Sequence, residues 1–258
     1  MKRILTIAAR TALVSIFAWA VFVPAASAVG QTVVSIEFDD GVADQYGALP
    51  ILNGHGMHAT FYINSGAVGD SLHMTWAQLT GLYAAGNEIG GHGLTHANLK
   101  KLKAAGLKTE INTDRLNLYD HGFLPVSFAY PFGNYNATVE QALKTYGYLS
   151  GRGVSGVDDR RVFAETIPPL DPFATRTPAN VKQGTTLATI ESMVTGAEQH
   201  GGGWVQLVFH HLGGADVYSV SVADFTALLD WLQLRAANGT VVETVTQVIG
   251  GVSVPPAP

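Results

Sequence analysis

Short apolar runs, rich in β-branched and aromatic residues, alternate along the chain with longer segments that have a helical spacing of apolar positions. Most of the short runs are apolar throughout, as expected for strands that are buried on both faces. The predicted strands cover residues 32–38, 59–64, 87–90, 126–130, 148–151, 204–209 and 240–245. The predicted helices cover residues 43–53, 75–85, 97–121, 134–146, 186–200 and 221–237. This repeated order predicts an α/β fold, a complete or incomplete parallel barrel.

The N-terminal segment has a different pattern from the rest of the chain. Three basic residues precede an apolar run, and the run ends in the small residues Ala26-Ser27-Ala28. These features are typical of a secretory signal peptide, and the apolar run is too short for a comfortable transmembrane helix. No later segment of the sequence is suited to cross a membrane. We therefore predict a signal peptide over residues 1–28 and a secreted protein, extracellular or cell-wall associated.

The remaining chain of about 230 residues is long enough for one large domain. We expect this domain to cover residues 29–250 and a flexible tail to cover residues 251–258. Residues 151–180 contain several prolines and charged residues, which predicts a long loop.

Composition and charge narrow the possible functions. Without the three basic residues of the signal peptide, 12 basic side chains face 20 acidic ones, a net charge of −8. This excess of acidic groups argues against a nucleic-acid partner. The chain has no cysteine, so disulfides and thiolate metal sites are excluded. Any metal must therefore be bound by nitrogen and oxygen ligands.

Ionisable residues follow several predicted strands at the point where each strand ends. Asp39 and Asp40 follow the first strand in F-D-D-G, and His92 and His96 follow the third in G-H-G-L-T-H. Each pattern alone also has a purely structural explanation. F-D-D-G can be a turn after a strand, and the two histidines can be unrelated to each other. In a parallel barrel, however, strand ends and the loops after them meet on one rim. We therefore expect these side chains to lie close together.

A divalent cation would explain both patterns. Histidines four residues apart lie on the same side of a helical turn, so both imidazoles can reach one ion, and a carboxylate from another strand completes the set. One acid of the Asp39-Asp40 pair would bind the ion and the other would act as a base on water. The cation would also relieve the repulsion between the two acids. Two imidazoles and one carboxylate favour Zn²⁺, and Co²⁺ or Ni²⁺ fit the same site.

Taken together, F-D-D-G, H-x-x-x-H, the P-F-G turn after the fourth predicted strand and a histidine after the late strand 204–209 resemble the motifs of the polysaccharide deacetylases of carbohydrate esterase family 4. The resemblance covers roughly residues 32–250. It implies a distorted (β/α) barrel of about seven parallel strands. It also implies metal-dependent hydrolysis of acetyl groups on sugars, usually the N-acetyl groups of amino-sugar polymers.

The resemblance also assigns roles to individual residues. It implies that Asp39 is the catalytic base and that Asp40, His92 and His96 form the metal triad. It also implies that the backbone N–H of Phe132 binds the oxyanion and that His210 is the general acid. The neighbouring His211 stays open as the general acid, because strand alternation could turn either histidine inward. The aromatic rings of Tyr130 and Phe132 could stack on a sugar face or belong to the core.

One position departs from the family pattern. Many members have an arginine two positions before the proline of the P-F-G motif, where it pairs with the catalytic base, but this chain has Ala129 there. Arg176, in D-P-F-A-T-R-T-P, is the replacement that we predict to pair with Asp39 and keep it ionised. The alternative is that Arg176 is a surface residue of a long loop.

These observations predict a secreted hydrolase that deacetylates an acetylated polysaccharide or oligosaccharide. Chitin, poly-N-acetylglucosamine, peptidoglycan and, as an ester, acetylated xylan are all compatible with the sequence. Two other functions stay open. One is a carbohydrate-binding protein with weakened catalysis, which the missing arginine at position 129 favours. The other is a metal amidase that acts on a non-sugar amide, since the same site chemistry would permit it.

Overall fold

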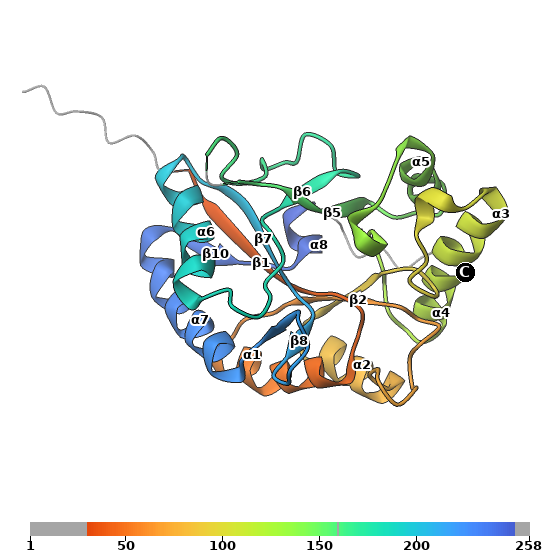
Figure 1. Ribbon diagram of the computed structural model, residues 1–258, viewed down its shortest axis with the longest axis horizontal. Coiled ribbons are helices and arrows are strands. Elements are labelled where there is room, and N and C mark those ends of the chain that lie inside the picture. The colour runs from red at the N-terminus through yellow and green to blue at the C-terminus, as the bar shows by residue number, and fades with distance from the viewer. Residues whose placement is uncertain (1–29, 159, 251–258) are drawn as a thin grey trace, which may run out of the picture.

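Seven parallel strands form a nearly closed barrel surrounded by helices, which confirms the predicted distorted (β/α) barrel (Figure 1). The structure is a computed structural model that describes residues 30–158 and 160–250. The predicted signal peptide over 1–28 and the predicted tail over 251–258 therefore lie outside the described residues.

The barrel strands follow the order β7-β1-β2-β3-β4-β5-β6, and every pair is parallel. They are β1 (Thr32–Phe38), β2 (Thr60–Ile63), β3 (Glu88–Gly91), β4 (Ser127–Ala129), β5 (Ser150–Gly156), β6 (Thr175–Thr177) and β7 (Gly203–Phe209). Along the described strands, β6 and β7 form no ladder, so the barrel is open between them. The short β10 (Thr240–Val242) pairs with the first half of β1, and β8 (His211–Leu212) pairs with β9 (Ser219–Val220).

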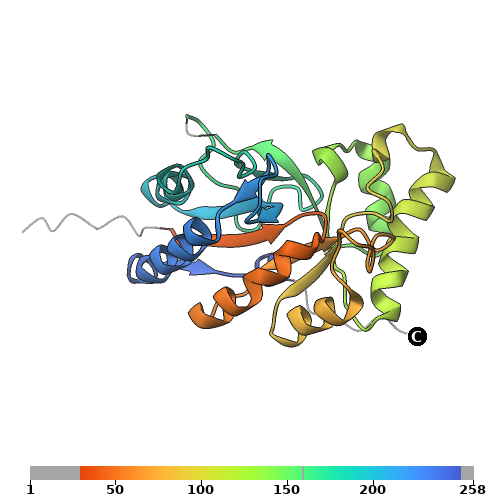
Figure 2. The same ribbon diagram turned by 60° about the horizontal axis from the view of Figure 1, so that its bottom comes forward.

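The helices lie outside the strands, with α1, α2, α6 and α7 along one side of the barrel and α3, α4 and α5 gathered at the other (Figures 1 and 2). The α-helices are α1 (Ala48–His55), α2 (Trp76–Ala84), α3 (Ala104–Leu107), α4 (Asp114–Asp120), α5 (Ala137–Thr145), α6 (Leu187–Gln199), α7 (Val222–Arg235) and α8 (Val245–Val248). The described residues also form helical segments of other types, the 3-10 helices η1 (Ala43–Gly47), η2 (Leu99–Lys101), η4 (Pro131–Gly133) and η5 (Ala236–Asn238) and the π-helix η3 (Lys108–Thr113). Within the described residues, no helix has the length and hydropathy needed to cross a bilayer.

The central strand β1 is buried on both faces, but its two faces differ in chemistry. Val34, Ile36 and Phe38 belong to the main hydrophobic core, which also contains buried residues of α1, α2, α6 and α7. The alternate residues Ser35 and Glu37 point into the barrel, where Ser35 accepts a hydrogen bond from the Trp204 indole at 2.8 Å. Strand alternation therefore puts apolar residues of β1 against the helices, whereas its inner face combines the apolar Val33 with the polar Ser35 and Glu37.

The amino ends of the strands are closed by α8. The backbone N–H of Val245 donates to Thr60 Oγ1 at 3.1 Å, and that of Thr246 donates to Glu88 Oε2 at 2.8 Å. Because β2 and β3 begin at Thr60 and Glu88, these bonds fix α8 beneath the barrel. The carboxyl ends of the strands carry the site.

The prediction of a continuous loop over residues 151–180 is wrong in part. Residues 150–156 form β5 and residues 175–177 form β6, which pair with each other. Glycine and charged residues obscure β5 in the sequence, because they weaken the usual apolar signal of a buried strand.

Candidate active site

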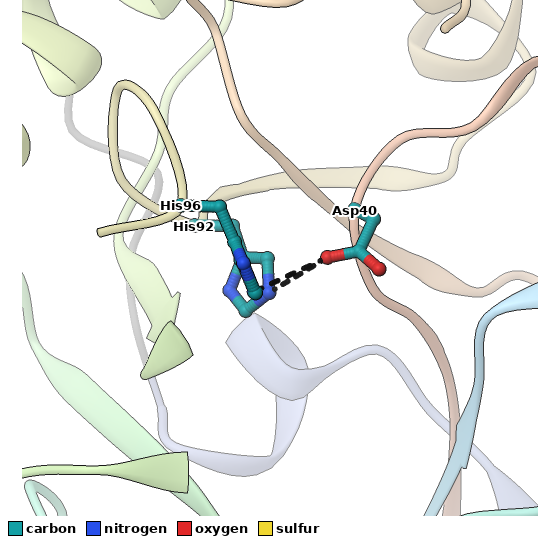
Figure 3. Close-up of side chains that lie close together, drawn as sticks. All are labelled: Asp40, His92 and His96. Carbon is teal, nitrogen blue, oxygen red and sulfur yellow. Dashed lines mark ion pairs between the residues drawn. The ribbon is translucent and has the colours of Figure 1, made fainter. Parts of the chain in front are cut away.

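Asp40, His92 and His96 come together at the carboxyl ends of β1 and β3 (Figure 3). Oδ1 of Asp40 lies 3.3 Å from Nε2 of His92 and 3.4 Å from Nε2 of His96. One ligand atom from each residue lies within 4.8 Å of the other two. The three predicted metal ligands therefore surround one point, as a shared ion requires.

The segment between the two histidines is a loop. His92 follows β3 directly, Gly93 has φ 82° and His96 has φ 57°, so the expected helical turn is wrong. Left-handed backbone at these positions folds the loop back and brings both imidazoles to the same side. The side-chain amide of Asn64 donates to the carbonyl groups of His92 and Gly93, at 2.7 and 3.1 Å, and holds the loop in place.

The hydrogen bonds of His92 prepare it to bind a cation. Its Nδ1 lies 2.7 Å from the carbonyl oxygen of Ala129, which can only accept, so Nδ1 carries the proton. Nε2 is then left with its lone pair directed at Asp40. Two imidazole nitrogens and one carboxylate oxygen form a donor set that suits Zn²⁺ and related divalent ions.

The charges around the triad also suit a cation. Burial would raise the pKa of Asp40, but hydrogen bonding to His92 and the nearby histidines hold it well below its usual range. Burial lowers the pKa of His96, and the charge of His92 acts in the same direction. Burial alone would lower the pKa of His92, but Asp40 and Asp39 raise it. Asp40 is thus an anion, and His92 lies next to two acidic groups that would also attract a metal ion.

Asp39 pairs with Arg152 on β5, and the predicted pairing with Arg176 is wrong. Nη2 of Arg152 donates to Oδ1 of Asp39, and both side chains are almost fully buried. Burial would raise the pKa of Asp39, but the charge of Arg152 holds it below the usual range. Arg176 instead donates two hydrogen bonds to Glu165, at 2.7 and 2.8 Å.

The position of Arg152 in the sheet explains why Ala129 can replace the expected arginine. In the register between β4 and β5, Arg152 lies directly beside Ala129. The guanidinium group therefore comes from the neighbouring strand at the same level of the barrel. A signal for it existed in the sequence, because S-G-R-G has a single charged residue between two glycines. This residue directly follows the predicted strand 148–151, which ended five residues before the end of β5.

A second acid contacts the same arginine. Oε2 of Glu37 lies 2.6 Å from Nε of Arg152, and Glu37 is completely buried. Burial raises the pKa of Glu37 to about 8, although the charge of Arg152 opposes this shift. Sequence analysis missed Glu37, because it lies inside an otherwise apolar strand.

The structure distinguishes between the two histidines that follow β7. Nε2 of His210 lies 4.0 Å from Oδ2 of Asp39, whereas His211 turns away and binds Asp44 through Nδ1 at 2.7 Å. His210 therefore faces the predicted base. Burial lowers the pKa of His210, while the charge of Asp39 partly offsets that effect.

Gln45 holds Asp39 and His210 together and was also missed from the sequence. Its completely buried side-chain amide donates to the carbonyl of Asp39 at 2.5 Å and to that of His210 at 2.6 Å. The ends of β1 and β7 are thus fixed relative to each other by one residue of η1. Nothing in the sequence singles out this glutamine, because its function depends on two backbone groups that are far apart along the chain.

Comparison with known proteins agrees with this geometry. Residues 26–151 match the family model described as polysaccharide deacetylase. This match includes both the F-D-D-G and H-x-x-x-H motifs. The chain contains a polysaccharide deacetylase domain.

Two relatives and one solved structure extend this result. YxkH of Bacillus subtilis (strain 168), whose name places it among the polysaccharide deacetylases, is 32% identical over 46% of this chain and 43% of its own length. A chitin deacetylase of Pestalotiopsis sp is 31% identical over 44% of this chain and 39% of its own length. The chain thus spans less than half the length of these relatives. A family 4 carbohydrate esterase from Streptomyces lividans, solved with acetate, has the same fold, with TM-score 0.55, 18% identity and coverage of 83% of this chain and 92% of the other.

The two aromatic residues predicted to contact substrate have different environments in this deacetylase domain. Phe132 is 59% exposed, and its ring lies 4.4 Å from that of His96. Tyr130 is buried, donates its hydroxyl to the carbonyl of Phe173 at 2.8 Å and stacks on Tyr135. Of the two alternatives for Tyr130, the structure supports a core residue, because its buried ring is not accessible to a sugar.

Backbone strain is concentrated at the site. Among the described residues, the non-glycine residues with positive φ are Asp40 (77°), His96 (57°) and Phe132 (58°). Such conformations cost about 1–3 kcal/mol each and persist where the surrounding structure enforces them. The deacetylase domain thus accepts strain where side chains must converge.

A pocket of about 640 Å³ opens beside the triad. Its lining combines the two predicted ligands Asp40 and His96 with the His211–Asp44 pair and the exposed Leu72. Polar groups next to apolar surface suit a hydroxylated ring with apolar faces. The pocket therefore leads from solvent to the predicted metal centre.

Proposed function

We propose that this protein is a secreted, metal-dependent deacetylase that hydrolyses N-acetyl or O-acetyl groups of a carbohydrate polymer. The observation that carries the proposal is the convergence of three metal-ligand side chains with a buried acid and a histidine at the end of the neighbouring strand β7. Secretion rests on the signal-peptide pattern in the N-terminal sequence. The family match supports deacetylation as the reaction.

Asp40, His92 and His96 would hold the cation, with Zn²⁺ favoured and Co²⁺ or Ni²⁺ suited to the same donors. When bound, such an ion lowers the pKa of water and polarises a carbonyl oxygen. The hydrogen bond from His92 Nδ1 to Ala129 fixes one ligand nitrogen toward this point before any ion binds.

Asp39 is suited to take the proton from the attacking water. Its carboxylate is ionised because Arg152 stabilises the charge, and Oδ2 is the oxygen that faces His210. Proton transfer to a positioned base typically contributes about 10²–10⁴-fold to a rate. The buried surroundings exclude competing water from the Arg152 side of the acid.

His210 is suited to give a proton to the leaving nitrogen. An amide nitrogen leaves poorly without a proton, so a general acid within reach of the leaving nitrogen is needed. Gln45 fixes the backbones of Asp39 and His210 relative to each other, which favours a constant distance between base and acid. The backbone N–H of Phe132 is the proposed oxyanion donor, and the ring of the same residue lies 4.4 Å from that of the predicted metal ligand His96.

Three observations support a sugar substrate with an N-acetyl group. The relative from Pestalotiopsis is named a chitin deacetylase. The pocket beside the triad and the exposed Phe132 ring offer polar and apolar surface for a sugar. Chitin oligomers, poly-N-acetylglucosamine and peptidoglycan are therefore the first substrates to test, and acetylated xylan tests O-deacetylation.

Acetate release from N-acetylglucosamine oligomers and from acetylated xylan, with and without a chelator, tests the proposal. Release that stops with chelator and returns with Zn²⁺ is the expected result. Asp39→Asn should abolish release while metal content stays near normal, and His92→Ala should lose the metal. Sugar binding without acetate release would instead indicate a carbohydrate-binding protein, and turnover of non-sugar amides alone would indicate a metal amidase. Equal metal loss in both variants would show that the roles of Asp39 and Asp40 are exchanged.

A further inference from the structure

The guanidinium group of Arg152 has a different partner at each of its three nitrogen atoms. Nη2 donates to Asp39, Nη1 donates to the carbonyl of Gly153 at 3.0 Å, and Nε lies 2.6 Å from Oε2 of Glu37. The ring of Tyr62 lies 5.0 Å from the guanidinium carbon. Arg152 is 1% exposed, so these protein groups alone fix its orientation.

Charge balance does not explain why a second acid lies here. Asp39 already neutralises Arg152, and burying another carboxyl group costs free energy. Within the described residues, the carboxylate oxygens of Glu37 have no polar partner other than Nε of Arg152, which Oε2 contacts as an ion pair. The close contact with Nε of Arg152 is therefore the interaction that gives this buried acid a function.

The geometry of β1 places the two acids correctly for one guanidinium group. Residues 37 and 39 are two apart, so their side chains point to the same side of the strand, about 6.6 Å from each other. Arg152 comes from β5, which is separated from β1 by three strands in the barrel order. A long side chain that crosses the barrel needs a contact near its stem to aim its far end.

We propose that Glu37 is a positioning residue for deacetylation: its carboxyl group holds Nε of Arg152 so that Nη2 stays on Asp39. The proposal rests on the proposed function, because only there does Asp39 act as a base. A carboxyl oxygen can accept from Nε–H whether or not the group is protonated. The raised pKa of Glu37, about 8, is therefore compatible with this role.

Two substitutions at one position separate positioning from packing. Glu37→Met removes the acceptor at similar volume, and Glu37→Gln keeps an amide oxygen that can accept from Nε. We expect Glu37→Met to lower kcat about 10- to 100-fold with little change in KM or zinc content, because small misplacements of catalytic groups have effects of this size. Glu37→Gln should retain kcat within about threefold of the wild type, since the hydrogen-bond acceptor is preserved.

Glu165→Met is the matched control. The side chain of Glu165 is also buried, 3% exposed, and forms an ion pair with Arg176 on β6. It pairs with Trp204 near the start of β7, whereas His210 follows the end of that strand. Glu165→Met should lower the melting temperature and leave kcat within about twofold, because it is remote from the site.

A double-mutant cycle tests whether Glu37 acts through Arg152. In an Arg152→Met background, Glu37→Met should change kcat by about twofold or less, because the interaction that it removes is already absent. Equal kcat losses for Glu37→Met in both backgrounds would overturn the proposal. An unchanged kcat in Glu37→Met, or the same loss in Glu37→Gln as in Glu37→Met, would also overturn it.

Crystal structures of the two variants test the geometry without any activity. The guanidinium group should leave Asp39 in Glu37→Met and stay on it in Glu37→Gln. An unmoved guanidinium group in Glu37→Met would contradict the positioning role, even if the wild type releases acetate. A wild type that releases no acetate would refute the proposed function instead. The position of the Arg152 guanidinium group in Glu37→Met would still decide whether Glu37 holds Arg152 on Asp39.

Discussion

Two arginines on neighbouring strands have opposite relations to the site. Arg152 on β5 lies in the barrel interior, 1% exposed, between Asp39 and Glu37. Arg176 on β6 has a side chain 32% exposed and makes a bidentate ion pair with Glu165. The two residues are close in the sheet, because Arg152 pairs in register with Thr175.

The difference follows from strand alternation. The register partner of Arg152 on β6 is Thr175, so the next residue, Arg176, points to the opposite face of the sheet. A shift of one residue thus decides whether an arginine reaches the predicted base or stabilises an outer loop. Sequence motifs that contain an arginine cannot indicate this without the register.

The largest expected effect comes from removing the inner arginine. Arg152→Met should lower kcat at least about 100-fold, because Asp39 loses the charge that keeps it ionised and in place. It should also destabilise the fold by about 3–5 kcal/mol, since two buried acids lose their partner. Steady-state kinetics and denaturant unfolding measure both effects. A variant with normal kcat would show that Arg152 does not act on the base.

Transfer of the arginine to the neighbouring strand should partly reverse this loss. In Ala129→Arg/Arg152→Ala, the new side chain starts beside the old position, because residues 129 and 152 are register partners. We expect kcat to rise about 10-fold above that of Arg152→Ala, which recovers part of the positioning effect. Kinetics of both variants provide the comparison. No recovery would show that the stem of the arginine must come from β5.

The outer arginine should affect stability and not turnover. Arg176→Met leaves Glu165 without its two side-chain hydrogen bonds, so we expect a loss of about 1–3 kcal/mol in the free energy of unfolding. The kcat should stay within about twofold, since Arg176 does not contact Asp39. Denaturant unfolding and acetate release measure the two effects. A large fall in kcat without loss of stability would remove the distinction between the two arginines.

The most gradual expected effect is a difference in how pH changes stability. Folding raises the pKa of Glu37 from 4.5 to about 8, so stability should decrease gradually as pH rises across that interval. Folding lowers the pKa of Glu165, so its contribution is present above pH 4.5 and is lost as pH falls through the folded pKa. Denaturant unfolding of Glu37→Gln and Glu165→Gln at several pH values measures both slopes. Glu37→Gln should lack the loss of stability toward high pH, and Glu165→Gln should lack the loss toward low pH. A wild-type slope between pH 5 and 8 that Glu37→Gln leaves unchanged would contradict the assignment.

Much of the fold could be predicted from sequence, because buried parallel strands and amphipathic helices have strong local patterns. The predicted strand 32–38 is β1 as observed, and the F-D-D-G motif identified Asp39 and Asp40. Most of β5, including Arg152, was missed, since Gly151 and Gly153 give it no apolar pattern. Gln45 and Glu37 could not be recognised, because their roles depend on contacts between segments far apart in sequence.

The most direct test of the central claim is a crystal structure of the zinc-loaded protein with the ion located by anomalous scattering. We predict one ion about 2.0–2.2 Å from an oxygen of Asp40 and from Nε2 of both His92 and His96, with Asp39 on Arg152 and not bound to the ion. An ion bound by Asp39 in place of Asp40, or one held at another site, would contradict the account.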